Sequence, residues 1–377
     1  MKTPWVHDLS PFLIQFTHGI GIRYYGLAYL TGFFLAYYFI DLMAKHGTIQ
    51  MKREQVADFI TYAAIGTLVG GRLGYAAFYA PSLFVTFTRS LPFWGLLAVN
   101  KGGMASHGGI IGVCTACYLY GRKNKIKVTH LIDVCTFGAG VGIFFGRIAN
   151  FINGELYGRP CKPKWYAVKY PSEIYTWGVN NHLNKLRQLG AAAHAVGTIT
   201  TRWGQKISVT VAQWNNWVTN FTNYTYQRNI DAFKQAIVDS TDHQNHAVIH
   251  ALRPVLTPRY PSELIQALLE GLSVFLILAW LWRKPRKPGF ISAMFGVLYA
   301  IMRIIGEEFR MPDFGIGYQW LGLTRGQWLS IGMLVIVIPY FYYVMKQPTQ
   351  PMGGWNRAAP AGDPADGTTG AAVKGST

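Results

Sequence analysis

The sequence predicts an all-α integral membrane protein, a bundle of seven transmembrane helices with an extracytoplasmic insertion. Its composition is the first reason: half of the 377 residues are hydrophobic, 15% are aromatic and only 14% are charged. Soluble domains carry about 25% charged residues, and aromatic side chains gather at the interfaces of membrane proteins. The other two reasons are the spacing of the apolar segments and the distribution of basic residues between them.

Seven apolar segments approach the roughly 20 residues that a helix needs to cross a bilayer. We expect spans near residues 22–42, 57–80, 106–121, 129–152, 262–282, 288–308 and 327–345. Glycines and single charges interrupt several of them, which indicates a bundle with a polar interior. The domains expected are a membrane domain split into 1–160 and 258–346, an extracytoplasmic insertion subdomain at 161–257 and a disordered cytoplasmic tail at 347–377.

Basic residues cluster after the first, third, fifth and seventh expected spans. They are Lys45, Lys52 and Arg53, then Arg122, Lys123, Lys125 and Lys127, then Arg283, Lys284, Arg286 and Lys287, and finally Lys346. Because basic loops stay on the cytoplasmic side, the N-terminus is expected outside and the C-terminus inside. The net charge of +18 therefore indicates contact with anionic lipid of the bilayer, and no nucleic acid is expected as a partner.

A short sequence motif occurs twice, once in the insertion and once at the start of the span that follows it. KYPSEIY at 169–175 resembles RYPSELI at 259–265. A serine between proline and an acidic residue commonly starts a helix, so shared helix-start chemistry explains the echo without a fold-level repeat.

Polar residues appear where an apolar helix should end in lipid. In GRIANFINGELYGRP, residues 146–160, Arg147 and Asn150 lie one helical turn apart, and Glu155 follows. A charged residue at the centre of a membrane helix costs roughly 2.5–3.5 kcal/mol on insertion scales. This cost indicates a function for the charge.

Other expected spans carry polar residues too. Tyr299, Arg303, Glu307 and Arg310 recur at helical spacing on one face, and the others are His107 in a glycine-flanked position, Arg72 with Tyr75, and Tyr24 with Tyr25. Each has a structural interpretation as well. Arg303 and Glu307 can form an ion pair between helices, Asn150 can join helices, and His107 can be a satisfied buried histidine. Arg72 can extend to a head group or pair with a neighbour, and the tyrosines can belong to the interfacial belt.

The combination favours an anionic ligand. Arg72, Arg147, Arg303 and Arg310 outnumber the acidic residues expected near them, Glu155, Glu307 and Glu308. The planar guanidinium group binds phosphate through two parallel hydrogen bonds. A histidine beside such a site accepts a proton near neutral pH. We therefore expect a phosphate-bearing lipid near the outer leaflet, with Arg72 among its ligands.

Six ordered blocks resemble the bacterial phosphatidylglycerol–prolipoprotein diacylglyceryl transferases. They are IRYYGLAYLTGF (22–33), GGRLGYAAFY (70–79), GGMASHGGIIG (102–112), GRIANFINGELYGRP (146–160), RYPSELIQALLEG (259–271) and YAIMRIIGEEFRMPD (299–313). The resemblance implies an enzyme of the bacterial inner membrane. It moves the diacylglyceryl group of phosphatidylglycerol to the lipobox cysteine in the signal peptide of a prolipoprotein. The product is a thioether, glycerol phosphate leaves, and neither a cofactor nor a metal is expected.

The resemblance also implies roles for individual residues. Those implicated in catalysis are His107, Arg147 and Arg303, and those implicated in substrate binding are Tyr25, Asn150, Glu155, Gly158, Tyr299 and Glu307. In the resulting hypothesis His107 takes the thiol proton, unless the arginines themselves lower the pKa of the thiol enough. The arginines stabilise the leaving phosphate, and Glu155 and Glu307 hold the arginines.

Departures from the family pattern leave two positions open. Where HPSQLYE is usual, this chain reads YPSELIQ, so Tyr260 replaces a histidine and Gln266 a glutamate. Two other classes also fit the arginine-rich spans, a secondary transporter for an anionic solute and a lipid-binding scaffold. Loss of His107 separates enzyme from scaffold, because only an enzyme that uses the imidazole as a base would lose turnover and keep its lipid.

Overall fold

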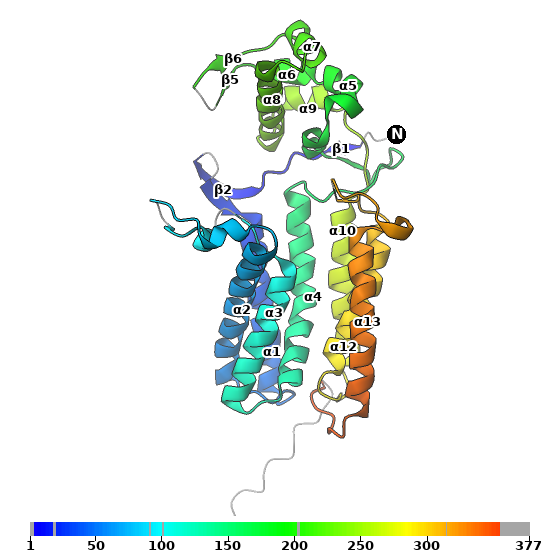
Figure 1. Ribbon diagram of the computed structural model, residues 1–377. Helices are drawn as coiled ribbons and strands as arrows, with labels where there is room; N and C mark the ends of the chain where they lie inside the picture. Colours follow the sequence, from blue (N-terminus) through cyan, green and yellow to red (C-terminus); the bar gives the residue numbers. More distant parts are fainter. Residues whose placement is uncertain are drawn as a thin grey trace, which may run out of the picture. The chain divides into compact units, whose positions relative to one another are not determined.

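The computed structural model describes residues 4–17, 20–89, 92–99, 102–201, 204–313 and 315–354 (Figure 1). The chain forms two compact units. The first comprises Met1–Gly32, Ala139–Phe275 and Gly296–Ile338, and the second Phe33–Gly138, Leu276–Phe295 and Pro339–Thr377. Of the expected tail, 347–377, residues 355–377 lie outside the described residues. In the remainder, Met352 forms a β-bridge with Arg286.

Each expected span coincides with a helical segment. These are α1 (Tyr24–Lys45), α2 (Glu54–Phe78), α3 (Ser106–Asn124), α4 (Val128–Ile152), the continuous α10 (Ser262–Gln266), η5 (Ala267–Ser273) and α11 (Val274–Leu281), α12 (Phe290–Glu307) and α13 (Arg325–Lys346). Within the described residues, five of the segments are long and apolar enough to cross a membrane, and α2 and α3 are not among them. The all-α membrane class is confirmed. Seven spans and the orientation stay predictions.

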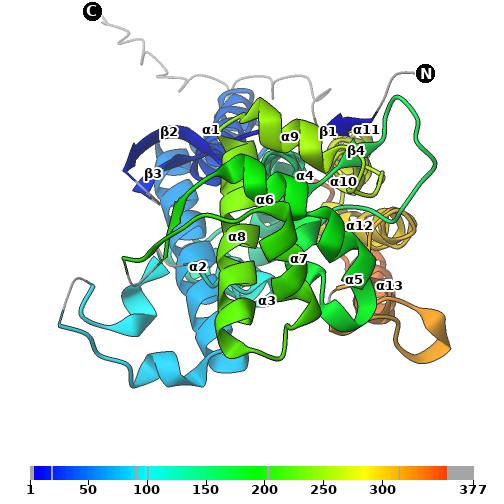
Figure 2. The same ribbon diagram turned by 90° about the horizontal axis from the view of Figure 1, so that it is seen from above.

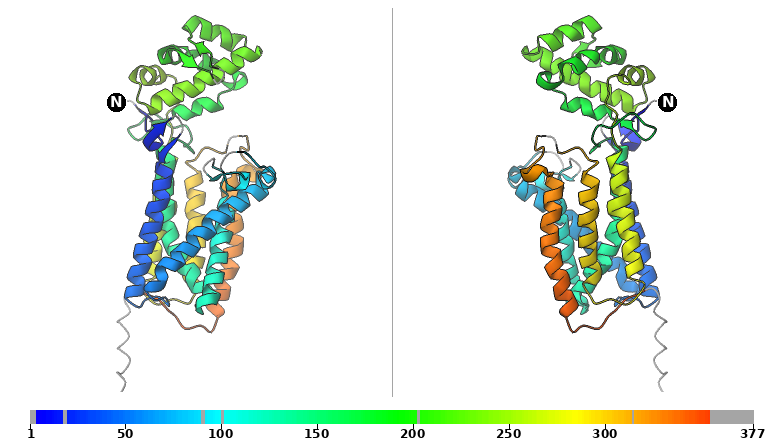
Figure 3. Two further views of the ribbon diagram at one scale, coloured as in Figure 1. Left: turned by 90° about the vertical axis from the view of Figure 1, so that its left-hand side faces the viewer. Right: turned by 90° about the vertical axis from the view of Figure 1, so that its right-hand side faces the viewer.

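In the second unit, α2 and α3 pack against each other through glycines (Figure 3). A Cβ atom added at Gly66 would lie 2.5 Å from the carbonyl oxygen of Gly112, and one at Gly70 would lie 2.4 Å from that of Gly108. No side chain fits at such distances. Small residues therefore bring the two helix backbones together, as is common in membrane bundles.

In the first unit, α4 packs equally closely against η5. A Cβ atom at Gly271 would lie 2.6 Å from the Cα atom of Phe144, and one at Gly140 would lie 3.3 Å from the carbonyl oxygen of Gly271. The η5 segment is π-helical, and such segments occur mainly as single turns at functional sites. The close approach holds this widened turn against the polar end of α4.

The insertion forms a helical subdomain in the first unit. It contains α5 (Val179–Gln188), α6 (Gly190–Val196), α7 (Val211–Thr219), α8 (Tyr224–Asp242) and α9 (His246–Leu252), with the hairpin β5 (Ile199–Thr200) and β6 (Lys206–Ile207). The central helix α6 contacts α7, α8 and α9 (Figure 2). Trp214, Phe233 and Leu186 are fully buried, and Val6 from the N-terminal segment belongs to the same core. The subdomain therefore has a hydrophobic core of its own.

Short elements join the subdomain to the rest of the first unit. They are the parallel pair β1 (Trp5–Val6) and β4 (Val168–Lys169) and the 3-10 helix η4 (Pro171–Thr176). The hairpin β2 (Phe12–Thr17) and β3 (Ile20–Arg23) directly precedes α1. The second unit has two further 3-10 turns, η1 (Pro81–Phe84) and η2 (Gly95–Leu97), and the first has η6 (Trp320–Gly322). The sequence did not predict the strands.

The two echoing motifs contact each other. Both begin helical segments, η4 and α10, as their shared helix-start chemistry predicts. The Tyr170 hydroxyl donates to Glu263 Oε2 at 3.1 Å, and Arg259 Nε donates to Glu173 Oε2 at 2.7 Å. Both carboxylates are fully buried. Each motif therefore supplies a carboxylate for the other, which fixes the subdomain to the start of α10.

Candidate active site

Glu270, in the π-helical turn, brings two arginines together. Its Oε2 accepts a hydrogen bond from Arg147 at 2.8 Å, and its Oε1 accepts one from Arg303 at 3.1 Å. The glutamate side chain is fully buried, and those of the arginines are 14% and 12% exposed. Burying an unpaired charge is costly, so the two guanidinium groups stabilise the carboxylate in this position. Arg147 and Arg303, on α4 and α12, therefore lie side by side.

Ion pairs continue from Arg303 toward the end of α12. Glu307 Oε1 lies 2.7 Å from Arg303 and 3.1 Å from Arg310, whose second nitrogen pairs with Asp313 at 2.7 Å. The Glu307 carboxylate also accepts from the Thr324 hydroxyl at 2.7 Å. The expected ion pair of Arg303 with Glu307 is thus present.

The arginine excess inferred from the sequence is smaller than expected. Three arginines of this network face two buried glutamates and Asp313, whose side chain is 40% exposed. The count of arginines and acidic residues made from the sequence had included neither Glu270 nor Asp313. Water screens the exposed aspartate, so within these ion pairs three guanidinium groups face two buried carboxylates.

Tyr25, Asn150 and Glu155 form a second polar cluster in the same unit. Asn150 Nδ2 donates to Glu155 Oε1 at 2.8 Å and to the Tyr25 hydroxyl, which in turn donates to Glu155. We expected Glu155 to hold an arginine. Instead, it orients a phenol and an amide, because the turn after α4 carries its carboxylate back toward the start of α1.

Tyr299 and Gly158 are the remaining predicted residues of this unit. The Tyr299 hydroxyl hydrogen bonds with Arg147, which places it beside the arginine pair. Gly158 has no room for a side chain, since its Cβ atom would lie 2.4 Å from the Tyr260 carbonyl oxygen and 2.7 Å from that of Phe309. Its amide donates to the Tyr260 carbonyl at 3.1 Å. The glycine therefore lets the loop after Glu155 pass between the start of α10 and the end of α12.

A buried polar stripe on α10 and η5 was noted from the sequence only at Gln266, as a departure from the family pattern. Glu263, Gln266 and Glu270 recur at three and four residues and are fully buried. Among the described residues, Gln266 Nε2 and Oε1 and Glu263 Oε1 have no hydrogen-bond partner. Buried polar groups almost always have one, so these atoms indicate a polar ligand beside Glu270. The spacing of the three residues in an apolar span was the signal available in the sequence.

Arg72 lies in the second unit, with a different set of partners. Its five donors are directed to backbone carbonyls, those of Gly95 at 2.7 Å, Leu96 at 2.7 Å, Ala98 at 3.2 Å, Gly102 at 2.6 Å and Gly103 at 2.9 Å. A guanidinium has five N–H groups, so these bonds use its hydrogen-bonding capacity. The geometry favours a structural role for Arg72, and we omit it from the proposed lipid site.

His107 also lies in the second unit. It is the second residue of α3 and is exposed, so the interpretation as a buried histidine is wrong. Its role as a base stays a prediction.

Comparison with known proteins agrees with the motifs. Residues 11–343 match the family model described as prolipoprotein diacylglyceryl transferase. The chain belongs to this family. It is 46% identical over 354 residues to the phosphatidylglycerol–prolipoprotein diacylglyceryl transferase of Bdellovibrio bacteriovorus, covering 93% of this chain and 97% of that protein. The proteins of the same name from Acidiphilium cryptum and Idiomarina loihiensis are 32% and 30% identical and cover 88% and 90% of this chain, and 90% and 94% of their own lengths. The resemblance seen in the sequence is confirmed.

Proposed function

We propose that this chain transfers the diacylglyceryl group of phosphatidylglycerol to the lipobox cysteine of prolipoproteins. The reaction takes place at the outer side of the bacterial inner membrane, in a seven-span protein with its N-terminus outside. Membership of the prolipoprotein diacylglyceryl transferase family supports the activity. The observation that carries the site is Glu270, which holds Arg147 and Arg303 side by side.

The arginine pair binds the phosphate of the lipid. Each guanidinium gives one terminal nitrogen to Glu270, and Arg303 gives the other to Glu307. Remaining N–H groups and the extra positive charge of the network are then available to phosphate oxygens, for which guanidinium geometry is suited. The network is assembled before the lipid arrives, so little reorganisation is needed during the reaction.

The reaction replaces a carbon–oxygen bond by a carbon–sulfur bond. The sulfur of the acceptor cysteine attacks the glycerol carbon that carries the phosphate, and the electron pair of the broken bond leaves with glycerol phosphate. Negative charge grows on the phosphate oxygens, where Arg147 and Arg303 stabilise it. Preorganised donors contribute roughly 3–4 kcal/mol each in comparable sites.

Neighbouring polar groups orient the reacting glycerol. Tyr25 and Asn150 are held by Glu155, and Tyr299 is held by Arg147. The unpartnered amide of Gln266 is available to an ester or hydroxyl oxygen of the lipid. Gln266 thus takes part in binding through its amide, although the family usually has a carboxylate at this position.

His107 accepts the thiol proton in this proposal. A thiol is a weak nucleophile until it is deprotonated, and histidine is the usual base near neutral pH. The exposed imidazole at the start of α3 can be reached by a substrate group. Replacement by glutamine should lower turnover and leave lipid binding unchanged.

The test is a mass spectrum of an acceptor peptide. Purified protein in detergent is mixed with phosphatidylglycerol and a peptide with a lipobox cysteine, beside the same reaction with Arg147→Ala. We expect a mass gain of one diacylglyceryl group that is lost in the variant. An unmodified peptide with lipid still bound to the protein would favour a lipid-binding scaffold.

A further inference from the structure

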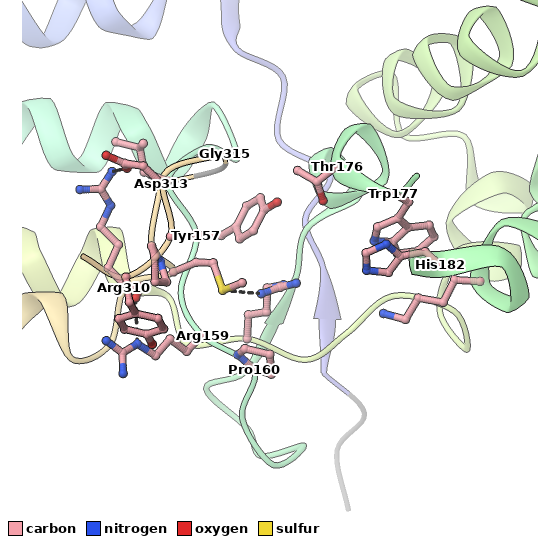
Figure 4. Close-up of a pocket in the computed structure, with 16 residues that line it drawn as sticks. Tyr157, Arg159, Pro160, Thr176, Trp177, His182, Arg310, Asp313 and Gly315 are labelled. Carbon is pink, nitrogen blue, oxygen red and sulfur yellow. Dashed lines mark hydrogen bonds and ion pairs between the residues drawn. The ribbon is translucent and has the colours of Figure 1, made fainter. Parts of the chain in front are cut away.

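A cleft of about 680 Å3 lies at the end of the arginine network in the first unit. Four parts of the chain line it: the loop 156–160 after α4, the end of η4 with α5, Arg259 before α10, and residues 310–313 and 315–318 after α12 (Figure 4). We call it the outer cleft. Its lining residues lie outside the five helices that are long and apolar enough to cross a membrane. It is therefore unsuited to the acyl chains of a lipid.

We propose that the outer cleft binds the part of the precursor polypeptide that directly follows the acceptor cysteine. This inference rests on the proposed function, which requires a polypeptide substrate as well as a lipid. It assigns to the inserted subdomain a role in recognising that polypeptide.

The outer cleft adjoins the arginine network through Arg310. This side chain lines the cleft and pairs with Glu307, which also pairs with Arg303. Figure 4 shows Arg310 and Asp313 on one wall, with Trp177 and His182 on the opposite wall. A polypeptide whose cysteine reaches the lipid phosphate would therefore continue into the cleft.

The lining suits an extended peptide. It combines aromatic rings and prolines with polar groups, and its volume lies in the range of sites that hold ligands much larger than a phosphate ion. Tyr318 is 55% exposed and provides an open aromatic surface. On the opposite wall, His182 Nδ1 is buried without a hydrogen-bond partner among the described residues. A peptide N–H or C=O group can satisfy this ring nitrogen.

Lys185 gives the cleft a charge preference. The three arginines of the lining already have partners. Arg159 donates to the backbone carbonyls of Arg310 at 3.0 Å and Glu307 at 3.1 Å and lies 3.7 Å from Glu308. Arg259 pairs with Glu173, and Arg310 pairs with Glu307 and Asp313. Lys185 instead donates to the Thr257 hydroxyl at 2.6 Å and lies 4.9 Å from the centre of the Trp177 ring. An acidic side chain of the peptide can replace this neutral partner, so the cleft should favour an acidic segment.

The experiment reverses the charge of Lys185. Three peptides share one lipobox and differ after the cysteine: one continues with acidic residues, one with lysines, and one ends at the next residue. In Lys185→Glu we expect KM to rise about tenfold for the acidic peptide and to fall for the lysine peptide. The short peptide should react as with the unaltered protein, because it does not reach the cleft.

Two further variants complete the design. Lys185→Gln keeps the length of the side chain and should remove the preference without reversing it, which guards against misfolding of the charge-reversed protein. Lys206→Glu makes the same charge change at an exposed position of the hairpin in the same subdomain and should change none of the three KM values.

Equal KM values for the acidic and lysine peptides in all proteins would overturn the inference and leave the proposed function standing. The inference would also be overturned if Lys185→Glu changed only the inhibition of the transfer reaction by added glycerol phosphate. The cleft would then be an exit path for the leaving group. Failure of the unaltered protein to modify any peptide would count against the proposed function itself.

Discussion

Two largely buried arginines on helices of this protein, Arg72 and Arg303, have opposite kinds of partner. Arg72 directs its five donors to backbone carbonyls of the segment 95–103. Arg303 pairs with two carboxylates, Glu270 and Glu307, and each of them is shared with another arginine. The first arrangement satisfies one guanidinium completely, whereas the second leaves donors and charge available.

The difference shows how a buried arginine can be assigned to structure or to ligand binding. Carbonyls are neutral and fixed by the backbone, so an arginine that binds five of them holds a loop in place. Shared carboxylates hold several guanidinium groups close together and only partly neutralise them. An anion that enters such a network gains charge-assisted hydrogen bonds at little cost in reorganisation.

The largest effect should come from Arg303→Ala. Glu270 keeps Arg147 and Glu307 keeps Arg310, so neither carboxylate is left without a cation and the fold should persist. Loss of a donor to the leaving phosphate should lower kcat/KM by about 10²–10³-fold. Peptide mass spectrometry measures the rate, and thermal unfolding in detergent checks the fold. Near-normal turnover in a folded variant would show that Arg303 serves only as an ion-pair partner.

Arg72→Ala should have the reverse result. Five carbonyls lose a donor, and each one that stays buried costs about 1–3 kcal/mol, so the melting temperature and the yield should fall sharply. Turnover per folded molecule should change far less than in Arg303→Ala. Arg72→Lys serves as the matched control, because an ammonium group can satisfy at most three of the carbonyls. If the Arg72→Ala protein were stable but inactive, Arg72 would have to be assigned to the lipid site after all.

Glu270→Gln should give an intermediate effect that tests the bridge between the two arginines. Glutamine keeps the size of the side chain, but it removes the negative charge and offers one acceptor oxygen to two guanidinium groups. Their mutual repulsion should disturb the phosphate site and lower kcat/KM by about 10- to 100-fold. Glu308→Gln is the control, since the Glu308 side chain is 59% exposed and pairs only loosely with Arg159, at 3.7 Å. Equal activities of the two variants would contradict the bridging role.

The sequence predicted the positions of the helices and of Arg147 and Arg303 better than the partners of these arginines. Spacing placed Arg147 with Asn150, and Arg303 with Glu307, on helix faces, because helix periodicity depends on local sequence alone. The meeting of Arg147 and Arg303 at Glu270 depends on how α4, η5 and α12 pack, and on a π-helical turn that shifts the register of a helix.

The partners of Arg72 could not be predicted at all. Every residue has a backbone carbonyl, so residue types in the segment 95–103 carry no sign of the arginine that binds them. The core of the inserted subdomain could not be predicted for a related reason. Trp214, Phe233 and Val6 lie far apart in the sequence, and only the folded chain shows that they pack together.

The smallest effect concerns Asp242, a half-buried carboxyl at the end of α8. Burial, and secondly repulsion by Asp239, raises the pKa of Asp242 to about 6. A carboxyl with a raised pKa in the folded state contributes stability at low pH that is lost as the pH rises through about 6. Asp242→Asn should therefore increase the free energy of unfolding at about pH 7.5 by about 1 kcal/mol or less after solvent screening. Thermal unfolding should show this as a higher melting temperature, and the gain should shrink toward pH 5.

Asp231→Asn is the matched control on the same helix. Its carboxylate is 75% exposed and lies 3.6 Å from Lys234, so removing its charge should give no gain in stability at either pH. Neither variant should change turnover, because both lie on a helix that contributes no residue to the arginine network or to the lining of the outer cleft. If Asp242→Asn were stabilising to the same degree at both pH values, the cause would be packing of the amide. Asp242 would then keep its charge in the folded protein and be stabilised by neighbouring groups, as Glu270 is stabilised by its two arginines.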